Sequence, residues 1–112
     1  MPKRRVERNL TGAALLFAAL GDPTRLGLIQ QLSHGGPASI STLADRQSIT
    51  RQGVTKHLRV LADAGIIDGS RRGREQVWTL NPQRLAEGRR HIDIIAAGWA
   101  QALDRLKFLL EE

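Results

Sequence analysis

The chain has 112 residues, 41% of them hydrophobic and 25% charged, which favours one globular domain and argues against general disorder. It has no cysteine, which excludes disulfides, thiolate-bound zinc and thiol redox chemistry. Its 17 Lys and Arg outnumber its 11 Asp and Glu, so the net charge is +6.

The N-terminal part predicts an arm and two helices. Residues 1–9 are expected to form a flexible basic arm ahead of a single domain over 10–112. A helix over 10–20 is rich in Ala and Leu, with Thr11 as its N-cap. Asp22 and the proline after it predict the start of a second helix, which should end before residue 35, since glycines follow there.

A helix-turn-helix pattern comes next, after a short extended stretch at 38–40. Ser41 can cap a brief helix over 41–47, and the chain breaks before residue 50. Thr50 can cap a second, recognition helix over about 50–64, which places Val54, Leu58 and Leu61 on its buried side. Gly65 is well placed to end this helix in the left-handed conformation.

A two-stranded hairpin, or wing, is predicted over about 66–80, with the polar segment 69–75 at its tip. A long helix should then run over about 82–111, opened by Asn81 and a proline. We therefore predict a mainly α-helical chain with a small two-stranded β-wing. This is a winged helix-turn-helix, whose long N- and C-terminal helices would form a dimer interface.

The positive charge is concentrated in two segments. Residues 1–8 carry 4 Lys and Arg against 1 Glu, and residues 46–74 carry 7 Lys and Arg against 2 Asp. The rest of the chain sums to 6 − 8 = −2. Such asymmetry is expected when one face meets a polyanion, although a face that is charged only for solubility is an alternative.

The first turns of the recognition helix carry side chains suited to DNA. The second helix of a helix-turn-helix lies in the major groove, where residues near its N-terminus reach base edges. Arg51 can pair with guanine and Gln52 with adenine. Gly53 would let the helix approach the DNA closely, and the threonines, the lysine and the histidine of this segment would contact the DNA backbone. The predicted set is Thr50, Arg51, Gln52, Gly53, Thr55, Lys56 and His57.

The tip of the wing adds a second cationic group. Arg71, Arg72 and Arg74 surround a glycine there and are suited to reach phosphates or a narrow minor groove. An exposed charged turn would have the same composition. Because the wing follows directly on a recognition helix, we expect it to contact DNA.

Together these stretches resemble the ArsR family of bacterial winged helix-turn-helix transcriptional regulators. The resemblance covers roughly residues 14–80. Its motifs are Gly-Asp-Pro-Thr-Arg at 21–25, Val-Thr-Lys-His-Leu at 54–58 and Leu-x-x-Ala-Gly-Ile at 61–66. It implies a homodimer that binds a palindromic operator on double-stranded DNA, usually as a repressor that an inducer releases.

The family's metal-sensing chemistry does not carry over. Many members have a Cys-x-Cys pair before the recognition helix, where this chain has none, so sensing through thiolates is excluded. Others bind zinc through Asp, His and Glu of the final helices. His91, Asp93 and Asp104 superficially suggest that pattern, but Lys107 stands where a further ligand is needed. We therefore assign no metal and no cofactor, and leave open a small-molecule effector of unknown identity.

The long final helix carries the apolar seam of a two-helix contact, because its apolar residues alternate steps of three and four. The first helix is apolar enough to join it, and packing of the final helix on its own domain is the alternative. The predicted interface residues are Leu16, Leu20, Ile92, Ile95, Trp99, Ala102, Leu106 and Leu109.

Other functions fit the sequence less well. No nucleophile and base stand at a recognisable spacing, so we expect no enzyme. A winged-helix module that binds proteins, or a nonspecific architectural DNA binder, stays an alternative. No apolar run approaches the roughly 20 residues of a membrane span, and the N-terminus lacks the apolar stretch of a signal peptide, so we expect a cytoplasmic protein.

Overall fold

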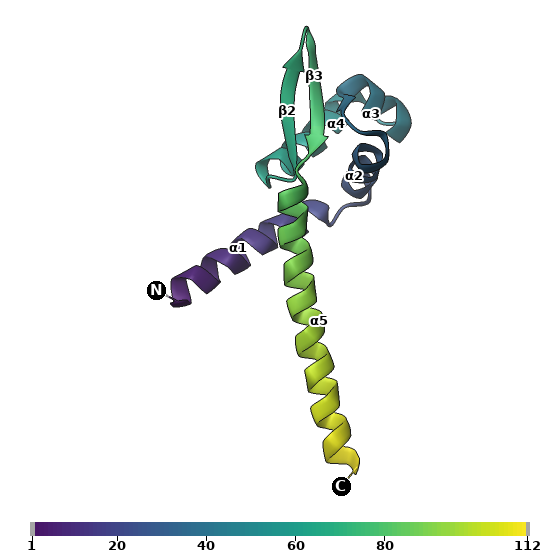
Figure 1. The fold of residues 1–112 in the computed structure, drawn as a ribbon. Coiled ribbons are helices and arrows are strands. Elements are labelled where there is room, and N and C mark those ends of the chain that lie inside the picture. The colour runs from purple at the N-terminus through teal and green to yellow at the C-terminus, as the bar shows by residue number, and fades with distance from the viewer. Residues whose placement is uncertain (1, 112) are drawn as a thin grey trace.

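A computed structural model describes residues 2–111 of the chain, and the side chains of residues 10–111. The fold is mostly helical with a small antiparallel sheet, as predicted (Figure 1). In chain order the elements are α1 (Pro2–Leu20), α2 (Pro23–Gly35), β1 (Ala38–Ser39), α3 (Ile40–Gln47), α4 (Arg51–Asp63), β2 (Ile67–Arg72), β3 (Glu75–Leu80) and α5 (Pro82–Glu111).

Helix α1 begins at Pro2, well before the predicted start at Leu10. Proline suits the first position of a helix, and no further proline or glycine interrupts the chain before Gly12. Thr11 therefore lies inside the helix, and its prediction as an N-cap is wrong. The predicted basic arm falls on this helix, apart from residue 1, which lies outside the described residues. Its flexibility stays a prediction.

Local capping explains where the central helices begin. The carboxylate of Asp22 accepts a hydrogen bond from the Arg25 amide at 3.0 Å, and Pro23 follows as the first helical residue, as predicted. Helix α3, however, is capped by Ser39 and not by Ser41. Because Ser39 is extended and belongs to β1, it can serve as a cap, whereas Ser41 already lies in the first helical turn.

The sheet has three strands in the order β1-β3-β2, one more than predicted. Strand β1 pairs through Ala38 with Trp78 of β3. Two residues are too few to show a strand periodicity, which is why the sequence reveals only an extended stretch there. The β2–β3 turn has Gly73 at a φ of 63°, a conformation that glycine adopts without strain.

One core joins the helix-turn-helix to the base of the wing. Its fully buried large residues come from α1 to α4 and from the entry to β2, and they are Leu16, Leu28, Leu43, Val54, Leu58, Leu61, Ile66 and Ile67. Apolar contacts thus pack the buried face of the recognition helix, α4, against the rest of the domain. These contacts set its orientation.

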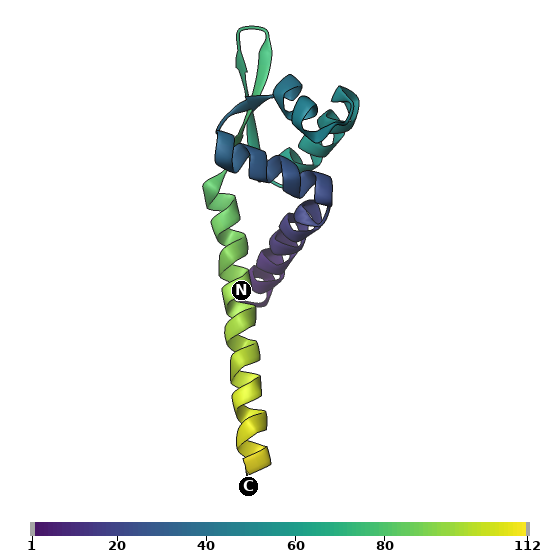
Figure 2. The same ribbon diagram turned by 90° about the vertical axis from the view of Figure 1, so that its right-hand side faces the viewer.

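Helix α5 leaves this body and projects away from it on the side opposite the wing tip (Figures 1 and 2). It crosses α1 where Gly88 faces Leu16, and a Cβ at position 88 would meet the Leu16 side chain. The molecule is therefore elongated, with extents of 67 × 34 × 20 Å.

No single helix among the described residues is both long and apolar enough to cross a membrane. The pair Leu10–Leu20 and Pro23–Gly35 reaches that length and composition only jointly, and the two helices are bent by 92° at the break between them.

Candidate nucleic-acid interface

Helix α4 has one buried and one exposed face. Val54, Leu58 and Leu61 have no exposed surface. Arg51 and Gln52 are exposed on the other side of the helix. Lys56 is exposed as well, and Thr55 is partly exposed. The structure thus gathers four of the predicted contacts on one accessible face of α4.

The start of α4 is held by its own cap. Thr50 Oγ1 accepts a hydrogen bond from the Gly53 amide at 3.0 Å, so its hydroxyl proton stays available to a phosphate. A Cβ at Gly53 would lie 3.2 Å from this oxygen. Glycine therefore leaves room for the cap, in addition to the close approach to DNA that the sequence suggests.

The Thr55 hydroxyl donates to the Arg51 carbonyl oxygen at 2.7 Å, one turn earlier in α4. A hydroxyl has a single proton to donate, and phosphate oxygens only accept. In this rotamer Thr55 therefore has no donor left for a phosphate, and its methyl group is the part that a base could contact.

His57 lies at the contact between α4 and α2, away from the face that carries Arg51 and Gln52. Its side chain is 27% exposed, and its Nδ1 lies 3.9 Å from the Asp22 carboxylate. Arg25 Nη1 donates to the same Nδ1 at 3.2 Å, which places the ring proton on Nε2. His57 follows Val54 by three residues and precedes Leu61 by four. Helical periodicity alone therefore places it next to the buried stripe of α4.

The contact with His57 belongs to a wider set of bonds that Arg25 makes. Arg25 Nε donates to the Ala19 carbonyl at 2.6 Å, which satisfies a free carbonyl at the end of α1. The backbone hydrogen bond from Arg25, and then its charge, lower the pKa of Asp22 below its usual value, although burial acts in the opposite direction. Arg25 thereby ties the end of α1 to α4.

Arg84 has a comparable anchoring role, which sequence analysis missed. It donates to the Ala64 carbonyl at 2.8 Å, to the Gly12 carbonyl at 2.7 Å and to Glu87 at 2.7 Å. The start of α5 is thereby joined to α1 and to the end of α4. No local pattern could reveal these contacts, because Arg84 and Gly12 are 72 residues apart.

The three arginines of the wing are all exposed, but they do not share one face. Arg71 pairs with Gln76 and Arg72 with Glu75, so successive side chains point to opposite sides of the hairpin. Arg74 lies in the turn. The cationic tip can therefore meet a polyanion from either side.

Arg59 is a further exposed cation on α4. It follows Lys56 by three residues and Thr55 by four, so it lies on the same exposed face as both. The charge of segment 46–74 was the signal that could have added Arg59 to the predicted contacts.

The predicted interface residues of α5 are largely open in the single chain. Ile92 is 51% exposed, Ile95 64% and Trp99 66%. Leu106 and Leu109 are also exposed, and Ala102 partly so.

The two interface residues predicted on α1 lie inward. Leu16 is 1% exposed in the core, so it has no surface to offer a second chain, and Leu20 packs against the same core. Leu10 and Leu15 are the exposed leucines of α1.

Among the described side chains, those of residues 10–111, no three from His, Asp or Glu gather closely enough to hold a metal ion. Asp93 and Asp104 are exposed on α5, and His91 is partly exposed there.

Comparisons with known proteins agree with this geometry. Residues 20–69 match the model of a helix-turn-helix domain family. The transcriptional regulator YuzN of Bacillus subtilis is 38% identical over 76 residues, which cover 62% of this chain and 83% of YuzN. A probable mercury resistance operon repressor of Streptomyces lividans is 33% identical over 81% of this chain and 72% of its own length. The structure of an ArsR-like transcriptional regulator from Rhodococcus sp. RHA1 superposes with a TM-score of 0.79 at 31% identity, covering 89% of this chain and 93% of that one.

Proposed function

The chain belongs to the ArsR family of winged helix-turn-helix transcriptional regulators, and we propose that it acts as a homodimeric repressor that binds a palindromic operator. The observation that carries the proposal is the exposed polar face at the start of α4, above a fully buried apolar face. Base readout needs this arrangement, because the helix must be fixed by its own domain while its first turns stay free.

The proposed DNA contacts are assigned by their placement. Arg51 and Gln52 read base edges, and Lys56 and Arg59 contact phosphates. Arg71, Arg72 and Arg74 contact the backbone from the wing. We leave His57 out of the set, because Arg25 and Asp22 already engage its ring.

The proposed dimer rests on the exposed apolar stripe of α5. A second copy that covers Ile92, Ile95 and Trp99 would remove this surface from water, which is the main driving force of association. A palindromic operator then follows from two-fold symmetry, with the two α4 helices about 34 Å apart in successive major grooves.

We further propose a cytoplasmic protein, with DNA and a small-molecule effector as its partners and no enzymatic role. His34 and His57 support the last point, since each has a structural partner. His34 donates a hydrogen bond to the Gln30 carbonyl oxygen, and His57 accepts a hydrogen bond from Arg25.

Binding to the DNA upstream of the protein's own coding region tests the proposal, against random DNA of equal length at about 0.15 M salt. We expect a preference of about 10³-fold or more. Tight binding without preference would instead favour an architectural DNA binder. Weak binding to all DNA would favour a module that binds proteins.

Two sets of variants separate the roles of helix and wing. Arg51→Ala or Gln52→Ala should cost about 1–3 kcal/mol on the operator and relax the base preference there. Replacing the three wing arginines by alanine should weaken binding to all sequences and flatten its salt dependence. Arg89→Ala on α5, also an exposed arginine, is the control and should change neither.

A further inference from the structure

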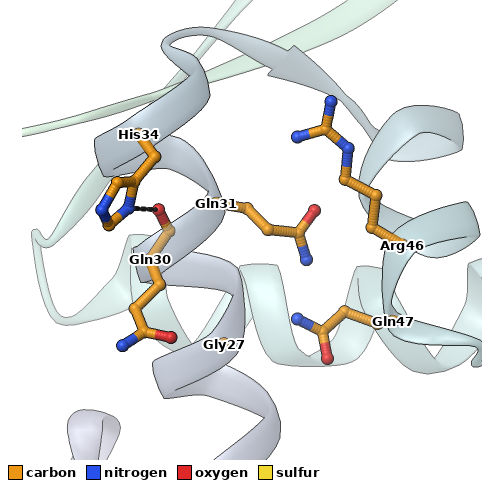
Figure 3. Close-up of a pocket in the computed structure, with 6 residues that line it drawn as sticks. All are labelled: Gly27, Gln30, Gln31, His34, Arg46 and Gln47. Atoms are coloured by element: carbon orange, nitrogen blue, oxygen red, sulfur yellow. Dashed lines mark hydrogen bonds between the residues drawn. The ribbon is translucent and has the colours of Figure 1, made fainter.

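A cleft of about 440 Å³ lies between α2 and α3, outside the proposed DNA contacts (Figure 3). Its lining comes from the two helices that precede α4, and every lining residue except Gly27 has a polar side chain. The lining residues are Gly27, Gln30, Gln31 and His34 of α2 and Arg46 and Gln47 of α3. Its volume falls in the range of small-molecule sites. Figure 3 shows Gln31, Arg46 and Gln47 directed toward the same space from facing helices.

Two polar groups in this cleft lack a partner. Gln31 Oε1 is buried and accepts no hydrogen bond. Arg46 has neither a hydrogen bond nor an ion pair within the described part of the chain. A buried acceptor without a donor costs free energy, so it is uncommon unless a ligand or water completes it.

Two glycines of α2 make room for the side chains of α3 that line the cleft. A Cβ at Gly27 would lie 2.5 Å from the Gln47 amide nitrogen, and one at Gly35 would lie 3.4 Å from Arg46 Nη1. The side chains of α3 can therefore lie close against α2. Arg46 thus lies near the C-terminal end of α2, where the helix dipole favours a cation.

His34 forms the side of the cleft. Its Nδ1 lies 2.8 Å from the Gln30 carbonyl oxygen, and because a carbonyl only accepts, the ring proton is on Nδ1. This bond fixes the ring against α2, and Figure 3 shows it beside the cleft and away from the three converging side chains.

We propose that this cleft binds a small organic hydroxy-carboxylate. The guanidinium of Arg46 pairs with the carboxylate, and Gln31 Oε1 accepts a hydrogen bond from the hydroxyl group. The Gln47 amide can donate to either group. A hydroxyl suits the site better than an ammonium, because a second cation beside Arg46 would be repelled.

The site gives the proposed regulator a place for its effector, and to that extent it rests on the proposed function. Gln47 is the last residue of α3, and only residues 48–50 separate it from α4. A ligand that joins α2 to α3 would therefore shift the start of α4, where Arg51 and Gln52 lie. Ligand binding should change the affinity for the operator in consequence.

The direct test is a titration of the full chain with L-lactate, followed by the side-chain amide signals of Gln31 and Gln47 in NMR spectra. Propionate lacks the hydroxyl and lactamide lacks the carboxylate, so they are matched controls. We expect saturable shifts with lactate at a Kd of about 1 mM or below, and at least about tenfold weaker binding of both controls. No saturable shift with lactate, or equal binding of all three, overturns the proposal.

Variants assign the two contacts. Arg46→Met should abolish lactate binding, and Gln31→Leu should make lactate and propionate bind equally, whereas Arg105→Met on α5 should leave binding unchanged. Far-UV circular dichroism checks that each variant is folded. The proposal is overturned if the Arg46→Met variant still binds lactate. It is likewise overturned if Arg46→Met weakens DNA binding and leaves lactate binding unchanged.

Operator affinity with and without lactate completes the experiment. Because the NMR titration needs no DNA, failure of the chain to bind DNA would overturn the proposed function and leave the ligand site standing.

Discussion

Helices α4 and α5 both carry apolar residues at steps of three and four, but only α4 buries them in its own chain. Val54, Leu58 and Leu61 of α4 have no exposed surface, whereas Ile95 and Trp99 of α5 are about two-thirds exposed. In α4 it is therefore the polar face that is exposed and can contact a partner. In α5 it is the apolar face that is exposed and can contact a partner. The same periodicity thus marks a folding surface in one helix and an assembly surface in the other.

The largest effect should follow from a change in the buried stripe of α4. Leu58→Ala removes a fully buried side chain and should cost about 2–5 kcal/mol of the free energy of unfolding. Denaturant unfolding measures this loss. Arg59→Ala, the next residue on the exposed face, is the matched control and should stay within about 0.5 kcal/mol of the original chain. Equal effects of the two changes would contradict the assignment of the two faces.

A change in the exposed stripe of α5 should act on assembly and not on folding. Trp99→Ala should weaken dimerisation by at least about 2 kcal/mol, because large aromatic residues dominate such contacts. Sedimentation equilibrium measures the dissociation constant of the dimer. Operator affinity should fall as the dimer is weakened.

Phe108→Ala is the matched control for Trp99→Ala. Phe108 is 64% exposed and follows Trp99 by nine residues, or two and a half turns, so it lies on the opposite side of α5. Dimerisation should be unaffected by this change. If it weakens the dimer as much as Trp99→Ala does, the interface is not the predicted stripe.

An intermediate effect is expected where the two regions are joined. Arg84→Met keeps the length of the side chain but removes its bonds to the carbonyls of Gly12 and Ala64, at a cost of about 1–3 kcal/mol. Thermal unfolding at fixed concentration measures it. Arg89→Met, on the exposed side of the same helix, should change little. A neutral result for Arg84→Met would mean that apolar packing alone holds α5 on the body.

The smallest effect should appear in acid, at the contact between α2 and α4. The hydrogen bond from the Arg25 amide, with the charges of Arg25 and His57, holds the pKa of Asp22 below its ordinary 3.8 in the folded chain. A lowered folded pKa adds stability that is fully present above the ordinary value and is lost as the pH falls through the folded one.

Asp22→Asn keeps an N-cap acceptor but no longer titrates. Its stability relative to the original chain should therefore rise as the pH falls below 3.8, which denaturant unfolding across this range can measure. A constant difference between the two chains at all pH values would show that the carboxylate has no coupling to its neighbours.

Most of the site could be predicted because its signals are local. The caps Asp22 and Thr50 accept hydrogen bonds from amides three residues later, so their spacing is visible in the sequence. The exposure of Arg51 and Gln52 followed from the periodicity of Val54, Leu58 and Leu61. His57 could have been placed by the same periodicity, but its basic neighbours favoured a DNA contact instead.

Local periodicity, capping and turn chemistry act over a few residues, and for that reason the sequence by itself determined the order of the helices, the wing and the exposed face of α4. The tertiary structure alone decided what depends on distant residues. It paired β1 with β3, buried Leu16 in the core, turned His57 toward Arg25 and joined Arg84 to Gly12. It also brought Gln31 and Arg46 to one cleft, because packing α2 against α3 sets which unpaired polar groups face each other.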